Sequence, residues 1–226
     1  MILNNADNVM IGSDEVSKIY CGSAVVWERG GGILPPGYTQ KKYLQTSGAQ
    51  VINTGYTPQT DVLRIEARIM YGQSRDKAIV QCRLFGLWTN TSQLYLYTNS
   101  NSDALFTTGS QLQNNQIFDF VAENDATQKL VQIDETQYTN TNAAQIADTS
   151  NPIYLLAGKY SNAQPISNFD YFYTGRMYYC KIYDNDALVR DFIPAVRDSD
   201  SKPGFYDLVT DQFFVNAGTG ADFTTN

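Results

Sequence analysis

The chain has 226 residues and a formal net charge of −7, and it contains no histidine. The acidic balance argues against binding to nucleic acid or to an anionic membrane, because both favour a basic patch. The absence of histidine removes the commonest general base and imidazole metal ligand, so Ser-His-Asp and Cys-His devices within one chain are excluded.

The cysteines and the apolar runs further restrict the class of protein to which the chain can belong. Cys21, Cys82 and Cys180 are far apart and form no C-x-x-C pair, so we expect buried free thiols rather than a disulfide framework or a zinc site. The chain has no run of about 18 apolar residues, so no membrane span is expected. Its first residues have no basic segment followed by an apolar one, so no secretory signal is expected either.

Residues 1–28 predict a small β module. Short apolar runs at 9–11, 16–21 and 24–27 are separated by turns that contain Gly and Ser. A unit of about 20 residues cannot bury a core of its own, because an isolated hairpin is marginal in water. The module is therefore expected to dock onto copies of itself or onto another protein. The candidate contact residues are Val9, Ile11, Ile19, Val25 and Trp27.

Residues 29–37 predict a linker, because three glycines remove stiffness and two prolines restore extension. From residue 38 to 226 the pattern is almost wholly that of β-strands, and no helical spacing is sustained over three turns. This favours one domain, a two-layer antiparallel sandwich. Strands are expected at 43–46, 51–53, 62–71, 78–88, 93–97, 104–106, 117–122, 129–133, 153–157, 205–209 and 212–215, together with a hairpin at 175–195.

The hairpin at 175–195 is the most regular part of the pattern. Asn185 and Asp186 tolerate the positive φ that tight hairpin turns require. Alternation with period 2 places Tyr178 on the same face as Cys180 and Ile182. The second strand is expected to end at or near Pro194, which lacks a backbone donor.

Several ordered segments resemble a known family. They are 43–56, 181–185, 188–194, 204–214 and 218–220. Together they are similar to the concanavalin A-like (laminin G-like) jelly-roll domains of gut bacteriophage and prophage virion proteins. The spacing of residues 9–27 resembles a short strand module of phage tail and fibre proteins. The resemblance implies a jelly-roll sandwich and a virion setting, but it implies no particular ligand, since this fold hosts lectins, hydrolases and inert spacers.

Enzyme chemistry has little support in the sequence. A glycosidase of this fold would need two carboxylates about 5–10 Å apart. A pattern such as Glu-x-Asp-x-x-Glu would present acids on one face of a strand, and the sequence has no such pattern. Calcium is conceivable at Asp198 and Asp200, or at Asp184 and Asp186, although Asx-rich turns have the same spacing. We therefore expect no catalytic residues, no cofactor and no metal, with the first pair as weak calcium candidates.

Carbohydrate binding is the sharper hypothesis, because aromatic faces pack on sugar rings while amides fix hydroxyls. Trp88, Tyr95 and Tyr97 flank a polar loop that contains Asn90, and Tyr171 belongs to a second aromatic cluster. The alternative is that these side chains only pack the sheet.

The expected function is that of a bacteriophage structural protein of the fibre, decoration or tail-accessory kind, which is not an enzyme. Its N-terminal module would contact other virion proteins, and its jelly roll would face outward, towards a host surface glycan. A homo-oligomer, with a trimer as the first guess, would bury the apolar side chains of the module. The alternatives are a glycan-cleaving hydrolase on the same fold and a bacterial surface adhesin.

Overall fold

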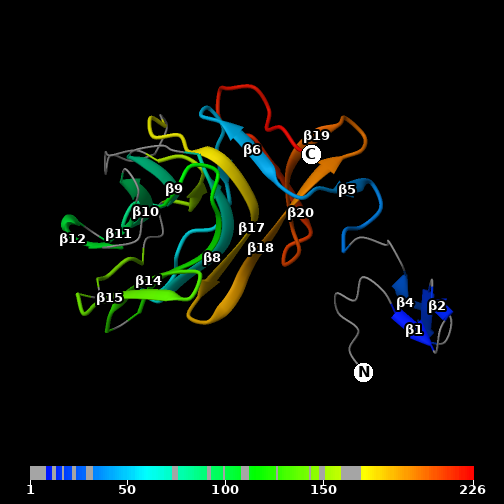
Figure 1. Ribbon diagram of the computed structural model, residues 1–226, viewed down its shortest axis with the longest axis horizontal. Helices are drawn as coiled ribbons and strands as arrows, with labels where there is room; N and C mark the ends of the chain where they lie inside the picture. The colour runs from blue at the N-terminus through cyan, green and yellow to red at the C-terminus, as the bar shows by residue number, and fades with distance from the viewer. Residues whose placement is uncertain are drawn as a thin grey trace.

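The computed structural model describes most of the chain (Figure 1). The described residues are 9–11, 14–16, 18–21, 24–28, 33–72, 76–90, 93–98, 100–107, 112–125, 127–142, 144–147, 151–158 and 169–226. Below residue 33, and at 100–103, only the backbone is described. Within this part of the chain no helix is long and apolar enough to cross a bilayer.

Two antiparallel sheets form the body of the protein. The smaller sheet has six strands in the order β12-β11-β10-β9-β16-β7. Its strands are β7 (Ile52–Asn53), β9 (Lys77–Gln81), β10 (Phe85–Asn90), β11 (Gln93–Thr98), β12 (Ser100–Phe106) and β16 (Tyr154–Leu155).

The larger sheet has ten strands, with the main order β15-β14-β13-β8-β17-β18-β19-β20 and with β5 and β6 paired to β18 and β17. The strands are β5 (Tyr38–Gln40), β6 (Leu44–Ser47), β8 (Leu63–Tyr71), β13 (Ile117–Asn124), β14 (Lys129–Ile133), β15 (Thr136–Asn140), β17 (Thr174–Asp184), β18 (Ala187–Arg197), β19 (Lys202–Asp207) and β20 (Gln212–Val215). The prediction of an all-β, two-layer antiparallel sandwich is confirmed.

The core lies between the sheets and follows from the alternation of the sequence. Ile65, Phe120 and Cys180 face inward from the ten-stranded sheet, and Leu87 and Leu96 face them from the six-stranded one. All five are at most 1% exposed. Burial of a side chain of the Leu, Ile or Phe class contributes about 1.5–3 kcal/mol. Cys82 and Cys180 are buried free thiols, as predicted, whereas the side chain of Cys21 lies outside the described residues.

The predicted hairpin is formed by β17 and β18. Asn185 and Asp186 have φ values of 50° and 62°, so the expected turn chemistry is confirmed. The expected place of Tyr178 is wrong, because the register shifts between Met177 and Tyr179. This bulge adds one residue to the strand, so Met177 is buried with the core face while Tyr178 is only half-buried.

The predicted end of the second strand at Pro194 is also wrong, since β18 continues to Arg197. The carbonyl of Pro194 accepts a hydrogen bond from the amide of Lys41, 2.9 Å away. The nitrogen and the carbonyl of one strand residue point to the same side. The nitrogen of Pro194, which cannot donate, therefore points to the side on which the neighbour of β18 changes from β17 to β5. No hydrogen bond of the sheet is lost there.

Two other predicted strands are divided in the structure. The run 78–88 becomes β9 and β10, and the amide of Cys82 donates to the carbonyl of Phe85 at 2.9 Å to close the turn. The run 16–21 becomes the end of β2 (Asp14–Val16) and β3 (Lys18–Cys21). Strands β5 and β15 were not predicted, because their short polar segments have no clear apolar alternation.

The N-terminal residues form two separate hairpins. β1 (Val9–Ile11) pairs with β2, and β3 pairs with β4 (Ala24–Glu28), each as a two-stranded antiparallel sheet. The side chains of the five predicted contact residues, which are Val9, Ile11, Ile19, Val25 and Trp27, lie outside the described residues. Their docking role stays a prediction.

The segment 34–40, at the start of the predicted domain, packs on the outer side of the larger sheet. Leu34 and Tyr38 pack on an apolar cluster that includes Ile193 and Tyr206, on the outer side of β18 and β19. The rings of Tyr38 and Tyr206 lie 4.8 Å apart in an edge-to-face arrangement. Part of the predicted linker therefore covers apolar surface of the sheet. The boundary at residue 38 stays a prediction.

A buried carboxylate fastens the loop before β8. Asp184 is 4% exposed, and its Oδ2 accepts hydrogen bonds from the hydroxyl of Tyr56 at 2.7 Å and from the amide of Gln59 at 2.6 Å. The hydroxyl of Thr60 donates to Oδ1. Burial and the bond to Asp184 raise the pKa of Tyr56 well above its usual range. These bonds hold the loop on the hairpin turn.

A second buried carboxylate, Asp207, is paired with an arginine. Nε of Arg190 lies 3.4 Å from Oδ2 of Asp207, and the two side chains are 13% and 0% exposed. Oδ1 of Asp207 also accepts from the amide of Asp191 at 2.8 Å and from that of Val209 at 3.1 Å. A buried charge needs such partners, because desolvation is otherwise costly. The pair is therefore part of the scaffold.

Candidate aromatic site on the six-stranded sheet

The strands β10 and β11 place the predicted aromatic residues on one surface. Leu87 and Leu96 point into the core, so side chains one position away point outward from the six-stranded sheet. Trp88 lies directly opposite Tyr95 in the β10–β11 pair, and both belong to a cluster with Tyr97. The three side chains that the sequence placed around one polar loop therefore lie together, and the structure adds that they are on the outer face of the sheet.

Tyr171, predicted as part of a separate aromatic cluster, joins the same group. Its ring centroid lies 5.0 Å from that of Trp88, which also lies 6.3 Å from Tyr95 and 6.0 Å from Tyr97. Phe106, from β12, stacks on Tyr95 with centroids 5.2 Å apart and an interplanar angle of 22°. We call these five residues the aromatic cluster.

The cluster has a buried centre and an accessible rim. Trp88 and Tyr95 are 1% and 7% exposed, whereas Phe106 is 39% exposed. Tyr97 and Tyr171 are half-buried. A ligand can reach only the rim, so the two central rings serve to support it rather than to contact a sugar. Asn90, the predicted amide partner, follows Trp88 on the same face and is half-buried.

A chain crossing covers the neighbouring part of this sheet. The backbone at Phe172 forms a parallel bridge with Ala78, and the amide of Ala78 donates to the carbonyl of Tyr171 at 3.1 Å. Phe169 packs edge-to-face on Tyr154 with centroids 4.8 Å apart. The aromatic surface thus continues from the cluster towards β16.

Gly86 shapes the rim. An added Cβ at this position would stand 2.4 Å from Cε1 of Tyr97 and 2.7 Å from Nε1 of Trp88. Glycine therefore allows the ring of Tyr97 to lie directly over the strand. The hydroxyl of Tyr97 accepts a hydrogen bond from Nε2 of Gln81 at 2.9 Å, which fixes the ring in this place.

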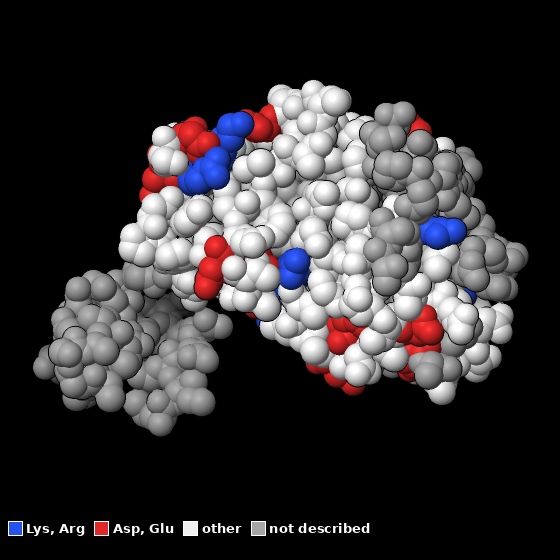
Figure 2. Space-filling view, turned by 180° about the vertical axis from the view of Figure 1, so that it is seen from behind, with Lys and Arg blue, Asp and Glu red and all other residues white. Residues whose placement is uncertain are grey.

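The outer face of the ten-stranded sheet is chemically different, because several of its charged side chains are paired with one another. Arg68 makes a bidentate contact with Asp119 at 3.1 and 2.6 Å, and the hydroxyl of Tyr179 donates to the same carboxylate at 2.9 Å. Lys181 lies 3.7 Å from Asp191. Figure 2 shows charged groups in small separate areas of a largely uncharged surface.

Two acids on that face, Glu123 and Asp191, have raised pKa values, and burial is the largest cause for both. Burial raises the pKa of Glu123 above its usual range, and nearby Asp125, Asp186 and Glu66 act in the same direction, while Arg64 opposes the shift. Glu123 lies opposite Arg64 in the β13–β8 pair. Glu66 is itself 3.4 Å from Nε of Arg64.

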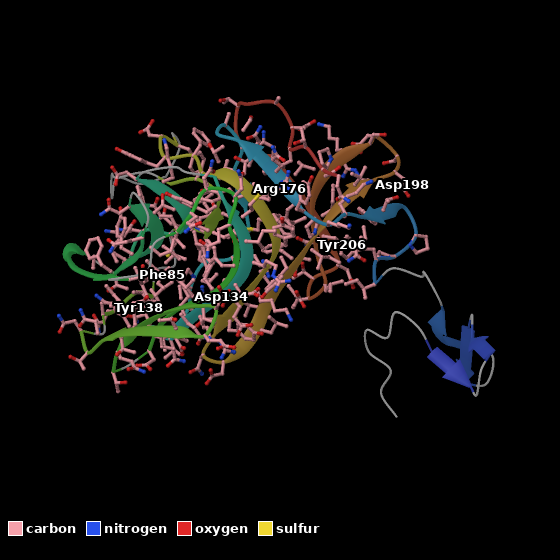
Figure 3. All side chains as sticks on the ribbon, viewed as in Figure 1. Phe85, Asp134, Tyr138, Arg176, Asp198 and Tyr206 are labelled. Atoms are coloured by element: carbon pink, nitrogen blue, oxygen red, sulfur yellow. The ribbon has the colours of Figure 1, made fainter. Side chains whose placement is uncertain are left out.

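The weak calcium candidates lie in a different part of the molecule. Figure 3 places Asp198 beside β5 and β19, far from Phe85, whose strand carries Trp88. Asp198 accepts from the hydroxyl of Thr39 at 2.8 Å. Arg197 binds both oxygens of Asp200 at 3.0 and 2.7 Å, and this bond lowers the pKa of Asp200.

The other carboxylate pair is also divided. Asp184 is bonded to the loop before β8, while Asp186 lies in the hairpin turn. In the described part of the chain no three side chains of His, Cys, Asp or Glu are grouped as metal ligands.

Sequence reasoning did not find every member of the site. Phe106 and Gln81 contact the predicted residues through strand register, which the local pattern does not define. Phe169 and Phe172 reach the sheet only through the chain crossing. The predicted aromatic cluster at 171–173 included Phe172 but not Phe169, and it was interpreted as separate from the residues around Asn90.

Comparisons with known proteins support the architecture. No family model matches the chain, and no curated protein sequence matches it. Solved structures with a similar fold include three from different organisms. They are a "putative carbohydrate binding protein" from Bacteroides ovatus (TM-score 0.57, 10% identity, 83% of this chain and 63% of that chain), a native heptameric SAP-like pentraxin from Limulus polyphemus (TM-score 0.52, 11% identity, 84% and 95%) and domains LG4-5 of mouse laminin alpha1 (TM-score 0.47, 12% identity, 67% and 44%).

These similarities concern the fold. The chain has a concanavalin A-like sandwich, which confirms the fold expected from the sequence. It spans 63% of the length of the Bacteroides ovatus chain. At identities of 10–11% the similarity does not extend to function.

Proposed function

We propose that the protein is a non-catalytic, lectin-like recognition module of a bacteriophage particle, in which the rim of the aromatic cluster contacts a host surface glycan. One observation carries the glycan-binding part of this proposal. The four aromatic residues that the sequence singled out converge on one outer sheet face, where Phe106 and the half-buried Tyr97 and Tyr171 reach solvent.

The chemistry of the rim suits a sugar. Aromatic faces pack against the C–H surface of a sugar ring, and amide groups such as that of Asn90 bind its hydroxyls. The central rings of Trp88 and Tyr95 hold the rim from below, which reduces the ordering needed on binding. The name of the similar Bacteroides ovatus protein points in the same direction, although its relation to this chain is one of fold.

Glycan binding can be tested through intrinsic fluorescence. The chain has two tryptophans, so the substitution Trp27→Phe leaves Trp88 as the only reporter. Glycans from host cell surfaces should change its emission in a saturable manner. Phe106→Ala should weaken binding by about two- to tenfold, because stacking contacts contribute about 0.5–1.5 kcal/mol. Ile117→Ala is the matched control, since Ile117 is a 50% exposed apolar residue on the other sheet. Equal loss in both variants would contradict the proposal.

The virion part of the proposal rests on different observations. The N-terminal residues resemble a phage strand module, and they form two separate two-stranded hairpins. Hairpins of this size need a partner surface for stability. We propose that copies of the chain supply it in a homo-oligomer, with a trimer as the first expectation, and that the module contacts other virion proteins.

Sedimentation and particle incorporation test this attachment role. The full chain should sediment as an oligomer, and the fragment 33–226 should sediment as a monomer and be absent from purified particles. A monomeric full chain, together with normal incorporation of the fragment, would be incompatible with the proposed role of the module.

A hydrolase is the second candidate, and the raised pKa of Glu123 favours it. Glu123 and Glu66 lie on the same outer face of β13 and β8, and a carboxylate pair with one raised pKa is the device of a glycosidase. The contact of Glu66 with Arg64 argues for a structural ion pair instead. Release of reducing ends from host polysaccharide, lost in Glu123→Gln and retained in Asp125→Asn, would favour the hydrolase.

A further inference from the structure

Arg83 lies beside the aromatic cluster, in the turn that joins β9 to β10. Phe85, labelled in Figure 3, is the first residue of β10 after this turn. In the last paired row of β9 and β10, Gln81 lies opposite Gly86, and Gly86 lies opposite Tyr97. At about 3.4 Å per residue, the Cα atom of Arg83 is within roughly 7 Å of that of Gln81. Because the amide of Gln81 reaches the hydroxyl of Tyr97 at 2.9 Å, Arg83 lies at the edge of the rim.

The guanidinium of Arg83 has no partner, unlike those of the other described arginines. Each of the others forms an ion pair with an acid or donates to a side-chain amide; they are Arg64, Arg68, Arg176, Arg190 and Arg197. Arg83 is half-buried, and its Nε is shielded from water without a hydrogen-bond acceptor. Within the described part of the chain no ion pair or ring contact involves this side chain either. Arg83 is therefore a cation that the fold leaves unpaired.

An external anion would complete this arrangement. A charged N–H group that loses water and gains no acceptor is costly, more so than a neutral one. The guanidinium offers its N–H groups in a planar fork, which matches the oxygens of a carboxylate or a phosphate. From these observations we infer that the glycan carries such an anionic group, and that Arg83 binds it while a sugar ring packs on the rim. This inference rests on the proposed function and deepens it.

Two negative contributions act against an anion at this place, and neither occupies Arg83. The net charge of −7 repels an approaching anion at long range. At physiological ionic strength this repulsion is screened beyond about 8 Å, so it slows association more than it weakens the contact. Asp170, in the crossing segment, is exposed, and among the described residues it forms no ion pair with Arg83. The guanidinium is therefore available to a ligand.

The test uses the full chain on an array of matched glycan pairs. One member of each pair carries a carboxylate or a phosphate; in the other member the carboxylate is reduced to an alcohol or the phosphate is removed. The acidic member should be retained at least about tenfold better, because hydrogen bonds between charged groups are among the strong ones. This preference should decrease as the sodium chloride concentration rises, because salt screens an ion pair at an accessible rim.

Four variants assign the preference to Arg83. Arg83→Gln should abolish it and leave the retention of the neutral members unchanged, whereas Arg83→Lys keeps the charge without the fork and should keep part of it. Arg176→Gln is the matched control, since Arg176 is a half-buried arginine on the ten-stranded sheet, and it should leave the preference unchanged. Phe106→Ala should weaken both members of each pair by the same factor, because the ring contact does not depend on the charge.

The outcomes separate the inference from the proposed function. Equal retention of the two members by the wild type, or a preference that Arg83→Gln retains, would overturn the inference and leave the proposed function intact. A changed sedimentation coefficient of Arg83→Gln would also overturn it, since Arg83 would then lie in a contact between copies of the chain. Retention of no glycan from any pair would overturn both.

Discussion

The substitution Gly86→Ala tests how the aromatic rim is built. The added Cβ would stand 2.4 Å from Cε1 and 2.6 Å from Cζ of Tyr97, and 2.7 Å from Nε1 of Trp88. Carbon atoms in contact are normally about 3.5–4.0 Å apart. The ring of Tyr97 must therefore move by roughly 1 Å. This movement breaks the 2.9 Å hydrogen bond from Gln81, because a bond of that length has little tolerance.

The magnitude follows from three contributions. Loss of the hydrogen bond destabilises the fold by about 1 kcal/mol. The disturbed contact between Tyr97 and Trp88 adds about 0.5–1.5 kcal/mol. Alanine in a strand is better than glycine by about 0.5–1 kcal/mol, which offsets part of the loss. Gly86→Ala should therefore lower the free energy of unfolding by about 1 kcal/mol, and it should weaken glycan binding through the displaced ring.

A double-mutant cycle in urea isolates this effect. In the Tyr97→Ala background the contact with the ring is absent, so Gly86→Ala should cost clearly less than in the wild type. The expected coupling is about 1 kcal/mol, above the roughly 0.3–0.5 kcal/mol within which independent sites add. Additive effects, or a stabilised single variant, would show that Tyr97 does not rest on Gly86.

Three further predictions concern the scaffold. Tyr56→Phe removes one donor to buried Asp184 and should lower the free energy of unfolding by about 2 kcal/mol in urea; no change would mean that the bond is absent in solution. Arg190→Ala leaves Asp207 buried without its cation and should cost about 3 kcal/mol, whereas an effect below 1 kcal/mol would refute the ion pair. The raised pKa of Glu123 means that the folded state holds the proton more tightly than the unfolded state. Stability should therefore fall as pH rises from about 4.3 through the folded pKa. Glu123→Gln should remove this decrease, as measured by urea unfolding at acid and neutral pH, and an unchanged profile would assign the decrease to other groups.

The sequence predicts those features of the fold that depend on local pattern. The alternation in β8 and the positive φ at Asn185 and Asp186 follow from residue type and period alone, and the structure has both. It does not predict the bulge after Met177. The bulge depends on how β17 pairs with its neighbour β8, and the local sequence does not define this pairing. It also places the strand end at Pro194 wrongly, because tolerance of proline depends on which strands lie beside it.

The candidate site shows the same division. The proximity of Trp88, Tyr95 and Tyr97 could be predicted, because a short loop joins β10 and β11 and brings them into register. The arrival of Tyr171 could not, since it depends on a parallel bridge between segments that are far apart in the chain. Tyr171 from that crossing packs on Trp88, and Phe106 from β12 stacks on Tyr95, so the two central rings are buried. For this reason the rim residue Phe106, and not Trp88, is the side chain expected to meet a ligand.

The two outer faces of the sandwich differ in their side chains, and this difference favours the six-stranded sheet as the proposed recognition site. On the ten-stranded sheet, Arg68 and Asp119 are half-exposed and already satisfy each other, and Tyr179 occupies the same carboxylate. A ligand on that face would have to break such contacts before making its own, and exposed pairs return at most about 1 kcal/mol each. On the six-stranded sheet the rim of Phe106 and Tyr97 offers ring faces that need not break ion pairs to bind. Because the core lies between the two faces, the sheet that carries the paired charges can stabilise the fold while the other one evolves a ligand preference.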